Sequence, residues 1–528
     1  MHLVRFSTAS VSACLFGCAL ASRAYALPAF PGAEGYGANA TGGRGGDVYY
    51  VTNLEDYGTG SNAIAGSLRY GIESATNSRT ILFKVSGNIR LKAKLAVNKP
   101  RITIAGQTAP GDGICLQDYT IFLDASDLIM RHVRTRLGTN AFQQADAMSI
   151  TAGTNIMVDH CSASWSVDET LSPTDRAQNL TVQWTYITES LNESIHKKGP
   201  HGYGSLIRPK IDAYYTFHHD LYAHHSSRNP RAGSYGDKVL RLDFRNNVIY
   251  NWGIKAGYNY YPGEHLELNY INNYLVRGPS TTCFSCAFDS VATNTYIFQS
   301  GNRFDVNLNG RLDGVDTGWH IFIGDHRKLS APHAVAAVAT DSAEVAYERV
   351  LAQAGAMPWR RDPVDTRVTS TVRDQNGQII DCTDQVGGWP ALHAEAPPVD
   401  SDNDGMPDYW EEAVGLNPNN PDDRNDTTAS GFTQLEEYLQ WLSEPHAIGH
   451  LNTMIDVDLR RLNGASGKNL TLAVGDAVHG SVRLLRNGRL ARFVPQKDFV
   501  GRASFRFHAS DAVTGVGFGP TSVGLLIG

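Results

Sequence analysis

The sequence predicts an all-β protein: a right-handed parallel β-helix, followed by a small EF-hand-like calcium module and a C-terminal β-sandwich. Three observations favour this fold class. A β-rich run recurs seven times between residues 128 and 304, the chain contains 51 glycines, and its composition changes near residue 395. Glycine at this frequency is typical of tight turns between strands rather than of helices. At 528 residues the chain is also too long for one ordinary core, so we expect several domains.

The recurring run combines alternating apolar positions with a central polar step. Its copies are residues 128–136, 156–164, 180–188, 215–223, 242–250, 266–275 and 296–304. Aligned on the central step, they are 25–35 residues apart, at His132, His160, Thr185, Asp220, Asn247, Asn273 and Gly301. Hairpins would show compact two-residue turns at each reversal, whereas these intervals are longer and uneven. Stacked solenoid coils explain them better, and the asparagines at 246, 247, 272 and 273 would then satisfy corner hydrogen bonds.

The N-terminus and two shifts in composition predict the domain organisation. Residues 1–26 have an arginine-bearing start, an apolar stretch and a small-x-small end, as in a secretory signal peptide, so we expect a secreted protein. No later apolar run reaches membrane-spanning length. The odd, sparse set of five cysteines after residue 26 does not make a disulfide framework. We expect the β-helix over residues 27–395, the calcium module over 396–445 and the β-sandwich over 446–528.

The calcium module is predicted by an acidic loop with EF-hand spacing. Oxygen ligands fall at loop positions 1, 3, 5, 9 and 12, glycine at position 6 and a backbone carbonyl at position 7. The ligands are Asp400, Asp402, Asp404, Met406 through its carbonyl, Asp408 and Glu411. A solvated acidic linker would explain the charge but not this spacing. The loop resembles EF-hand and thrombospondin type 3 modules, and a second loop over residues 426–437 lacks two of the carboxylates.

The acidity of the chain belongs to this module. Residues 396–445 hold 12 Asp and Glu against one Arg, so the net charge of −7 says nothing about the ligand of the main domain. Between residues 196 and 238 there are seven Lys and Arg against three Asp. Such a local basic patch suits a polyanionic substrate. Residues 446–528 alternate apolar and polar positions and resemble cadherin-like modules, which bind or space.

Several segments in order resemble the pectate lyases of polysaccharide lyase family 1, including the fungal pectate lyase C type. They are residues 29–54, 66–69, 102–114, 159–172 and 227–231. The resemblance implies a parallel β-helix and β-elimination across the α-1,4 link of polygalacturonate. In that reaction a base removes the proton at C5, while a metal ion and a cation stabilise the developing charge. It implies a carbon-oxygen lyase that uses Ca²⁺, acts on pectin as a monomer, and binds no nucleic acid.

The same resemblance assigns the calcium ligands of the main domain. Asp146 in QQADAMSI matches the aspartate on the strand before the Asp-His strand, and Asp168 in DETLS matches the first of two later carboxylates. The second falls on Ser172, so one expected ligand is missing, and Glu169 is the candidate to replace it. Solvent-exposed turn acids are the structural alternative.

The remaining assignments are basic residues. Lys198 in HKKGPHGY resembles the lysine that contacts the substrate carboxylate, with Lys197 as the fallback and a solvated lysine pair as the plain alternative. Arg228 in SRNPR matches the arginine proposed as the base. An arginine base is unusual because the free pKa exceeds about 12. The second arginine of the motif falls on Gly233, so Arg231 is the candidate for the anion contact.

Two other function classes fit parts of the sequence. A polygalacturonase-like glycoside hydrolase on the same fold would need paired carboxylates and no arginine base. A non-catalytic polysaccharide-binding protein would explain the serine at 172 and the accessory modules. Product analysis separates the hydrolase from the lyase, because only the lyase forms an unsaturated uronate. Inactivity of the intact protein would favour the binder.

Overall fold

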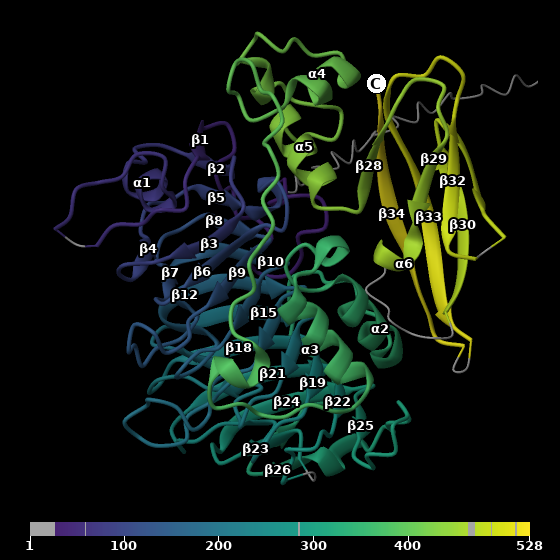
Figure 1. The fold of residues 1–528 in the computed structure, drawn as a ribbon. Coiled ribbons are helices and arrows are strands. Elements are labelled where there is room, and N and C mark those ends of the chain that lie inside the picture. The colour runs from purple at the N-terminus through teal and green to yellow at the C-terminus, as the bar shows by residue number, and fades with distance from the viewer. Residues whose placement is uncertain (1–26, 59, 284–285, 463–469, 487, 513–514) are drawn as a thin grey trace, which may run out of the picture.

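The computed structural model describes residues 27–528, apart from 59, 284–285, 463–469, 487 and 513–514. The expected signal peptide, residues 1–26, lies outside the described residues. The main body is a parallel β-solenoid, as predicted, with strands stacked coil upon coil along one axis (Figure 1). In the described part of the chain, no helix is long and apolar enough to cross a membrane.

Three parallel sheets form the walls of the solenoid. The first sheet consists of β4 (Leu95–Val97), β7 (Ile121–Leu123), the first parts of β10 (Met148–Asp159) and β12 (Leu171–Gln183), β14 (Leu206–Pro209), β17 (Arg231–Ala232), β20 (Gly257–Tyr258), β23 (Phe288–Ser290) and β26 (Phe322–Gly324). The second consists of β1 (Asp47–Val51), β2 (Arg79–Phe83), β5 (Ile102–Ala105), β8 (Leu128–Arg131), the last parts of β10 and β12, β15 (Ala213–His218), β18 (Val239–Arg245), β21 (His265–Ile271), β24 (Asn294–Ser300) and β27 (Arg327–Lys328).

The third sheet has nine strands and completes each coil. It consists of β3 (Gly87–Arg90), β6 (Ile114–Gln117), β9 (Val133–Arg136), β11 (Ser162–Ser164), β13 (Tyr186–Thr188), β16 (Leu221–Ala223), β19 (Val248–Tyr250), β22 (Tyr274–Val276) and β25 (Arg303–Asp305). Aliphatic and aromatic side chains from all three sheets fill one continuous core inside the solenoid. Each recurring run of the sequence therefore holds two short strands, one of the second sheet and one of the third, with a corner between them.

A ladder of polar side chains runs along this corner. The Oδ1 atom of Asp220 accepts from Thr185 N at 2.8 Å, that of Asn247 from Asp220 N at 2.9 Å, and that of Asn273 from Asn247 N at 3.0 Å. Asn302 Oδ1 continues the ladder at Asn273 N, at 2.9 Å. The expectation of stacked corner asparagines is confirmed at Asn247 and Asn273. The ladder satisfies backbone donors that a buried corner would otherwise leave unpaired.

The alignment on the central polar step was wrong by one residue in three copies. His132, His160 and Gly301 are not ladder residues. Each occupies the position one residue before the ladder, where the backbone has positive φ. That position is shared by His132, His160, Trp184, His219, Asn246, Asn272 and Gly301. A left-handed residue turns the chain between the two strands, and glycine and asparagine adopt it most readily.

Helices cover the third sheet, which an all-β class did not anticipate. They are α2 (Ala343–Gln353) and α3 (Pro363–Arg373), and Figure 1 shows them beside β19 and β22. Ser342 and Asp362 cap their N-termini through side-chain acceptors. Their apolar faces pack on buried residues of the sheet. The other helical segments of residues 27–395 are α1 (Leu68–Glu73), η1 (Gly106–Thr108), η2 (Gly318–Ile321), η3 (Pro358–Arg360) and η4 (Thr383–Val386).

The acidic segment folds into two short helices and a 3-10 turn above the first coils of the solenoid (Figure 1). These are α4 (Asp408–Val414), η5 (Asp423–Asn425) and α5 (Gln434–Leu442). Met406, Trp410 and Leu439 pack with Leu82 of β2 and Ala105 of β5 in one buried cluster. The segment therefore shares a core with the solenoid.

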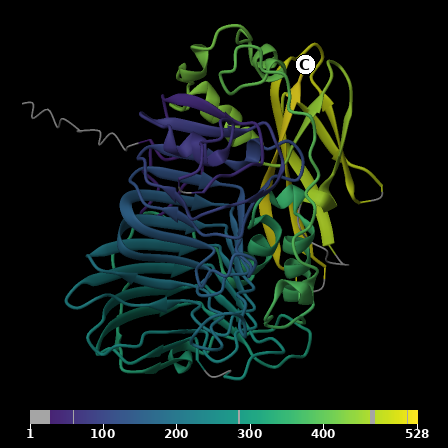
Figure 2. The ribbon, with the colours of Figure 1, turned by 60° about the vertical axis from the view of Figure 1, so that its left-hand side comes forward.

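The C-terminal segment forms two sheets beside the solenoid (Figure 2). Its elements are β28 (His446–Gly449), β29 (Ile455–Asp458), α6 (Leu459–Leu462), β30 (Leu470–Val478), β31 (Gly480–Leu484), β32 (Leu490–Pro495), β33 (Gly501–Asp511) and β34 (Gly517–Ile527). Phe493, Phe505 and Phe507 lie in the core that both sheets share. Strand β28 pairs in parallel with β34, and the other pairs are antiparallel.

Candidate active site and calcium sites

Three carboxylates meet at one edge of the first sheet. Asp146 comes two residues before β10, while Asp168 and Glu169 come just before β12. In a parallel sheet, residues that precede adjacent strands lie at the same edge. Ligand oxygens of the three side chains lie within 4.8 Å of one another. The structure thus brings together the three residues that the sequence assigns to the main-domain calcium.

The three carboxylates differ in their surroundings. Asp146 accepts a hydrogen bond from Ser149 Oγ at 3.0 Å, and burial together with the charge of Asp168 raises its pKa to about 7. Burial also acts to raise the pKa of Asp168, but the hydrogen bond and charge of His201 outweigh it and hold that pKa below its usual value. Mutual repulsion at short distance favours one proton, or one cation, among these groups.

Ser172, where the family pattern has a carboxylate, is buried beside this cluster. Its hydroxyl accepts from Leu206 N at 3.1 Å and is also hydrogen bonded to Asp146. A serine therefore orients Asp146 where a further ligand was expected. Glu169, which the sequence offers as the replacement, does reach the cluster.

Arg228 reaches Glu169 from two coils further along the solenoid, with the Tyr203 segment between them. Isolated parallel bridges from Glu169 to Tyr203 and from Tyr203 to Ser227 stack the three segments. The Arg228 guanidinium forms an ion pair with Glu169, its Nε donates to Tyr258 Oη at 3.1 Å, and its Cζ lies 4.0 Å from the centre of the Tyr203 ring. Its backbone φ is 66°, a strained value for a residue other than glycine, and such strain gathers at functional sites.

Arg231 is placed differently from what an anion contact requires. Its side chain is 4% exposed and forms an ion pair of 2.5 Å with Glu264, which also pairs with Arg208 at 2.8 Å. A Cβ on Gly233 would meet Glu264 Oε2 at 2.6 Å and Arg231 Nη1 at 3.1 Å. The guanidinium of Arg231 therefore reaches the place where a side chain at 233 would begin, but it faces a protein carboxylate.

Lys197 and Lys198 are exposed next to the cluster. Lys198 N donates to His196 Nδ1 at 3.2 Å, and His196 Nε2 lies 3.7 Å from Asp168 Oδ2. Among the described residues, neither lysine takes part in an ion pair, whereas the other five Lys and Arg between 196 and 238 all do. This lysine pair is the positive charge of the predicted basic patch that is left for an anionic ligand.

Four functional candidates were missed in the sequence. His201 donates to Asp168 across 2.9 Å and stacks on His196, with ring centres 3.9 Å apart, while Tyr203 and Tyr258 contact Arg228. The signal for the histidines was their position on both sides of the lysine pair in HKKGPH. The tyrosines gave no signal, because only the stacking of coils brings them to Arg228.

Comparisons with known proteins place the chain in a family. No protein-family model matches it. A probable pectate lyase C of Aspergillus fumigatus is 38% identical over 419 residues, which cover 78% of this chain and 93% of that protein. A probable pectate lyase C of Emericella nidulans is 36% identical over 420 residues, or 78% and 92% of the two chains. The chain belongs to the pectate lyase family.

As a member of this family the protein is a lyase. Solved structures similar to the lyase include the major allergen of cedar pollen, with a TM-score of 0.44 and 18% identity, covering 60% of this chain and 90% of that one. A mutant pectate lyase of Bacillus subtilis has a TM-score of 0.42 and 13% identity, with 64% and 99% covered.

The acidic loop of the lyase gathers most of its predicted calcium ligands. Oxygens of Asp400, Asp402 and Asp404 lie within 4.8 Å of one another, and Asp404 forms a second such group with Glu411 and Asp423. The predicted carbonyl ligand, Met406, is buried next to them, and its N–H donates to Asp404 Oδ1 at 2.8 Å. The donor set is all oxygen, as Ca²⁺ prefers.

The loop differs from the EF-hand pattern at position 9. Asp408 lies outside both groups, because its two oxygens accept from Ser401 N at 2.8 Å and Ser401 Oγ at 2.7 Å. Asp423, which the sequence did not assign, takes part instead. Only the turn between α4 and η5 brings this residue back to the loop.

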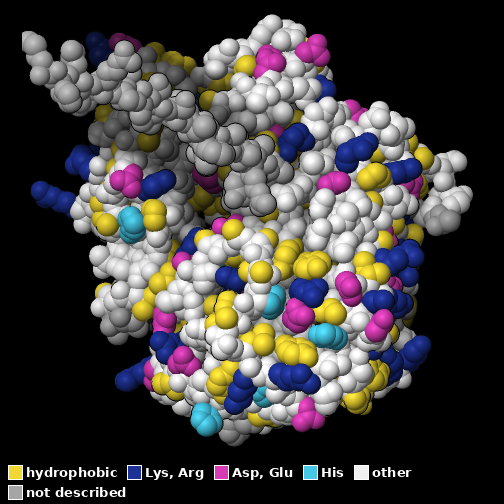
Figure 3. Space-filling view, turned by 180° about the vertical axis from the view of Figure 1, so that it is seen from behind, with side chains coloured by type: hydrophobic (Ala, Val, Ile, Leu, Met, Phe, Trp, Pro, Cys, Tyr) yellow, Lys and Arg dark blue, Asp and Glu magenta, His cyan; other side chains and the backbone are white. Residues whose placement is uncertain are grey.

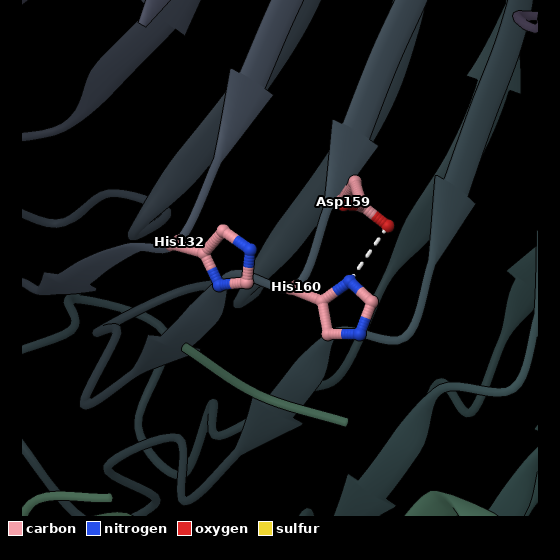
Figure 4. A group of neighbouring side chains, drawn as sticks. All are labelled: His132, Asp159 and His160. Atoms are coloured by element: carbon pink, nitrogen blue, oxygen red, sulfur yellow. Dashed lines mark hydrogen bonds and ion pairs between the residues drawn. The ribbon is translucent and has the colours of Figure 1, made fainter. Parts of the chain in front are cut away.

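A third group of possible ligands is a hydrogen-bond network. His132, Asp159 and His160 lie together at one corner of the solenoid (Figure 4). Asp159 accepts from Arg131 at 2.7 Å, from His160 Nδ1 at 2.8 Å and from Gln183 at 2.8 Å. Its oxygens are therefore satisfied by protein donors. His132 Nδ1 accepts from Met357 N, which puts the proton of a neutral ring on Nε2 and removes that atom as a ligand.

Proposed function

We propose that this pectate lyase is secreted and cleaves α-1,4-linked polygalacturonate by calcium-assisted β-elimination, releasing 4,5-unsaturated oligogalacturonates. The observation that carries the proposal is the convergence of Asp146, Asp168 and Glu169 beside Arg228, with Lys198 exposed next to them. A polyuronate needs such a site: acidic oxygens that share a cation with it, a basic side chain for its carboxylate and a base near C5.

Asp146, Asp168 and Glu169 would hold the calcium ion. Their oxygens converge, and burial together with the charge of Asp168 raises the pKa of Asp146 to about 7, a cost that a cation would relieve. Bound there, calcium would stabilise the negative charge that develops on the uronate carboxylate. His201 orients Asp168, and Ser149 and Ser172 orient Asp146. Lys198 would hold the substrate carboxylate, and Arg231, facing Glu264, is better suited to position this region than to bind an anion.

Arg228 would take the proton from C5, after which the C4–O4 bond breaks and O4 leaves with a proton from solvent. Its ion pair with Glu169 stabilises the protonated guanidinium, which is the wrong form for a base. The Glu169 carboxylate cannot form a full ion pair with Arg228 and coordinate a cation at the same time. We therefore expect the base to be most effective when Glu169 is engaged elsewhere and at alkaline pH.

The spacing of the carboxylates argues against the hydrolase alternative. An inverting glycosidase needs two carboxyl groups about 6.5–9.5 Å apart, with room for a water molecule. The three carboxylates instead converge, with ligand oxygens within 4.8 Å of one another, which is closer than that geometry requires. For the accessory parts we propose a calcium-binding module over 396–445 and a cadherin-like binding or spacing module over 446–528.

The direct test is the absorbance of the unsaturated product with polygalacturonate at alkaline pH. We expect turnover with added calcium and none in excess chelator. A rise in reducing ends without the chromophore would mean hydrolysis, and binding without turnover would favour the non-catalytic alternative. Methylated and de-esterified pectins, assayed side by side, would define the preferred substrate.

The lysine pair provides a test of substrate contact with a built-in control. Lys198→Ala should lower kcat/KM by about 10–100-fold, because a charge-assisted contact contributes roughly 1.5–3 kcal/mol. Lys197→Ala removes the same charge from the same exposed loop and should have a much smaller effect. Equal losses in both variants would show general electrostatic attraction rather than a specific contact.

A further inference from the structure

The acidic loop leaves six carboxylate oxygens buried without a hydrogen-bond partner. They are Asp400 Oδ1, Asp402 Oδ2, Asp404 Oδ2, both Glu411 oxygens and Asp423 Oδ1. Asp404 and Glu411 are fully buried, and Asp423 is 7% exposed. In the described part of the chain, none of the five residues takes part in an ion pair. Burying charges without partners is very costly, so these carboxylates must be neutralised by a cation or by protons.

The loop is built to present these oxygens. Asp402 Oδ1 accepts from Asp404 N at 3.2 Å, and Asp404 Oδ1 accepts from Met406 N at 2.8 Å. Asp423 Oδ2 accepts from Asn417 N at 3.3 Å. In each case one oxygen fixes the chain and leaves the other oxygen directed into the cluster. Backbone hydrogen bonds thus hold the carboxylates of Asp402, Asp404 and Asp423 in place.

The loop is also attached to the first coils of the solenoid. Tyr50 of β1 donates to Asp400, and Lys84 Nζ donates to Asn403 Oδ1 at 2.9 Å. Gly405 has φ +112°, and a Cβ there would lie 3.0 Å from Leu82 Cδ1 and 2.9 Å from Leu435 Cδ1. The loop conformation and the contact with β2 therefore depend on each other.

The degenerate second loop shows how the module neutralises charge without an ion. Glu437 accepts from Ser430 Oγ at 2.5 Å, from Thr428 Oγ1 at 3.3 Å and from Arg502 of β33 at 2.7 Å. A guanidinium and two hydroxyls surround the carboxylate that would end a second calcium loop. In the first loop no described guanidinium or ammonium pairs with the five carboxylates, and Tyr50 donates only to Asp400.

We propose that Asp400, Asp402, Asp404, Glu411 and Asp423 bind one calcium ion that fastens the 396–445 segment to the N-terminal coils of the solenoid. Asp423, supplied by the segment between the two loops, takes the place of Asp408. The ion is a structural lock and is separate from the cluster at Asp146. The inference rests on the calcium module of the proposed function, but it is independent of the lyase reaction.

The test uses the full-length protein without substrate. Calcium titration is followed by calorimetry and by thermal unfolding for the wild type, Asp423→Asn and the matched control Asp408→Asn. We expect Asp423→Asn to weaken calcium binding at the acidic loop by about tenfold or more. It should also remove most of the calcium-dependent rise in Tm, since affinity depends on ligand charge. Asp408→Asn should leave the calcium affinity of the acidic loop and the calcium-dependent rise in Tm within about twofold of their wild-type values.

Two results would overturn the proposal: wild-type calcium binding by Asp423→Asn, or loss of the site in Asp408→Asn. If Asp423→Asn does not fold, limited proteolysis of the wild type with and without calcium decides. Cleavage between residues 396 and 445 only in chelator supports the lock, and equal protection in both conditions contradicts it. Neither readout involves pectate, so failure of the lock and failure of the lyase proposal are distinguishable.

Discussion

The two carboxylate clusters use similar residues in opposite ways. At the solenoid edge, Asp146, Asp168 and Glu169 are each engaged by a protein donor: Ser149, His201 and Arg228. In the acidic loop, six buried oxygens have no such donor among the described residues. A cation or an anionic ligand at the first cluster would have to compete with these donors. The second can be neutral only by holding a cation or protons, which suits a permanent structural site.

The two clusters also differ in what surrounds them. Exposed lysines flank the first, while the second lies against the apolar contact with Leu82. The solenoid face seen from behind carries basic, acidic and histidine side chains among apolar ones (Figure 3). Positive charge near the first cluster can recruit a polyanion. At the second cluster, a loop held in one conformation would strengthen the apolar packing.

The largest expected effect is a loss of activity that leaves the calcium-dependent stability unchanged. Arg228→Ala should lower kcat by about 10³-fold or more, since a positioned base contributes roughly 10²–10⁴. Calcium-dependent Tm should stay at the wild-type value because Arg228 is remote from the acidic loop. Tyr258→Phe is the matched control, since it removes only the hydroxyl that contacts Arg228 Nε, and should cost about tenfold or less. A fully active Arg228→Ala enzyme would exclude Arg228 as the base.

Two isosteric substitutions, one in each cluster, should have opposite effects on activity and on calcium-dependent stability. Asp168→Asn should reduce kcat about 100-fold, because it removes one ligand charge and leaves only a neutral oxygen to accept from His201, yet keep the calcium-dependent rise in Tm. Asp404→Asn should lose most of that rise. Activity assays at saturating calcium and thermal melts of both proteins check these opposite effects. If both variants lost the calcium-dependent rise, the clusters would be one coupled site.

Without calcium, the acidic loop should make stability fall as pH rises. Burial and the neighbouring carboxylates raise the pKa of Asp404 to about 7 and that of Glu411 to about 8. A raised folded-state pKa adds stability below the unfolded value of about 4, and that stability is lost as pH rises through about 7–8. Melts in chelator between about pH 5 and pH 8 should show a falling Tm, and calcium should remove the fall. A flat profile in chelator would contradict it.

The smallest expected effect lies in the corner ladder. Asp220 is buried where the later coils have asparagine, burial raises its pKa well above the usual value, and its Oδ2 has no partner. In the neighbouring step Asn247 donates Nδ2 to Phe217 O at 3.0 Å. Asp220→Asn should therefore stabilise the protein by about 1 kcal/mol. The gain should grow as pH rises, because the stability that protonated Asp220 provides is lost through its folded-state pKa.

Chemical unfolding of Asp220→Asn at acidic and alkaline pH measures this gain. The matched substitution Asn247→Asp should reverse the sign and destabilise the protein more at high pH. A pH-independent difference between wild type and Asp220→Asn would show that Asp220 is ionised in the fold.

The repeat and the motifs were readable in the sequence because they are local. Alternating strands at intervals of 25–35 residues predicted the solenoid, and asparagines at 247 and 273 predicted the corner hydrogen bonds. The alignment slipped at His132, His160 and Gly301, because the left-handed corner residue and the ladder residue are adjacent and both are polar. Helices α2 and α3 were overlooked because a repeat pattern says nothing about the segment that follows it.

The sequence by itself determined the family, the coil pattern, the acidic loop and the candidates Asp146, Asp168, Glu169, Lys198 and Arg228. Tertiary structure alone decided which side chains meet across coils and modules. It set Arg228 on Glu169, turned Arg231 to Glu264, and replaced Asp408 by Asp423 in the acidic loop. Spacing along the chain fixes contacts within one turn or loop. Contacts between residues tens of positions apart depend on coil height and packing, which no local pattern records.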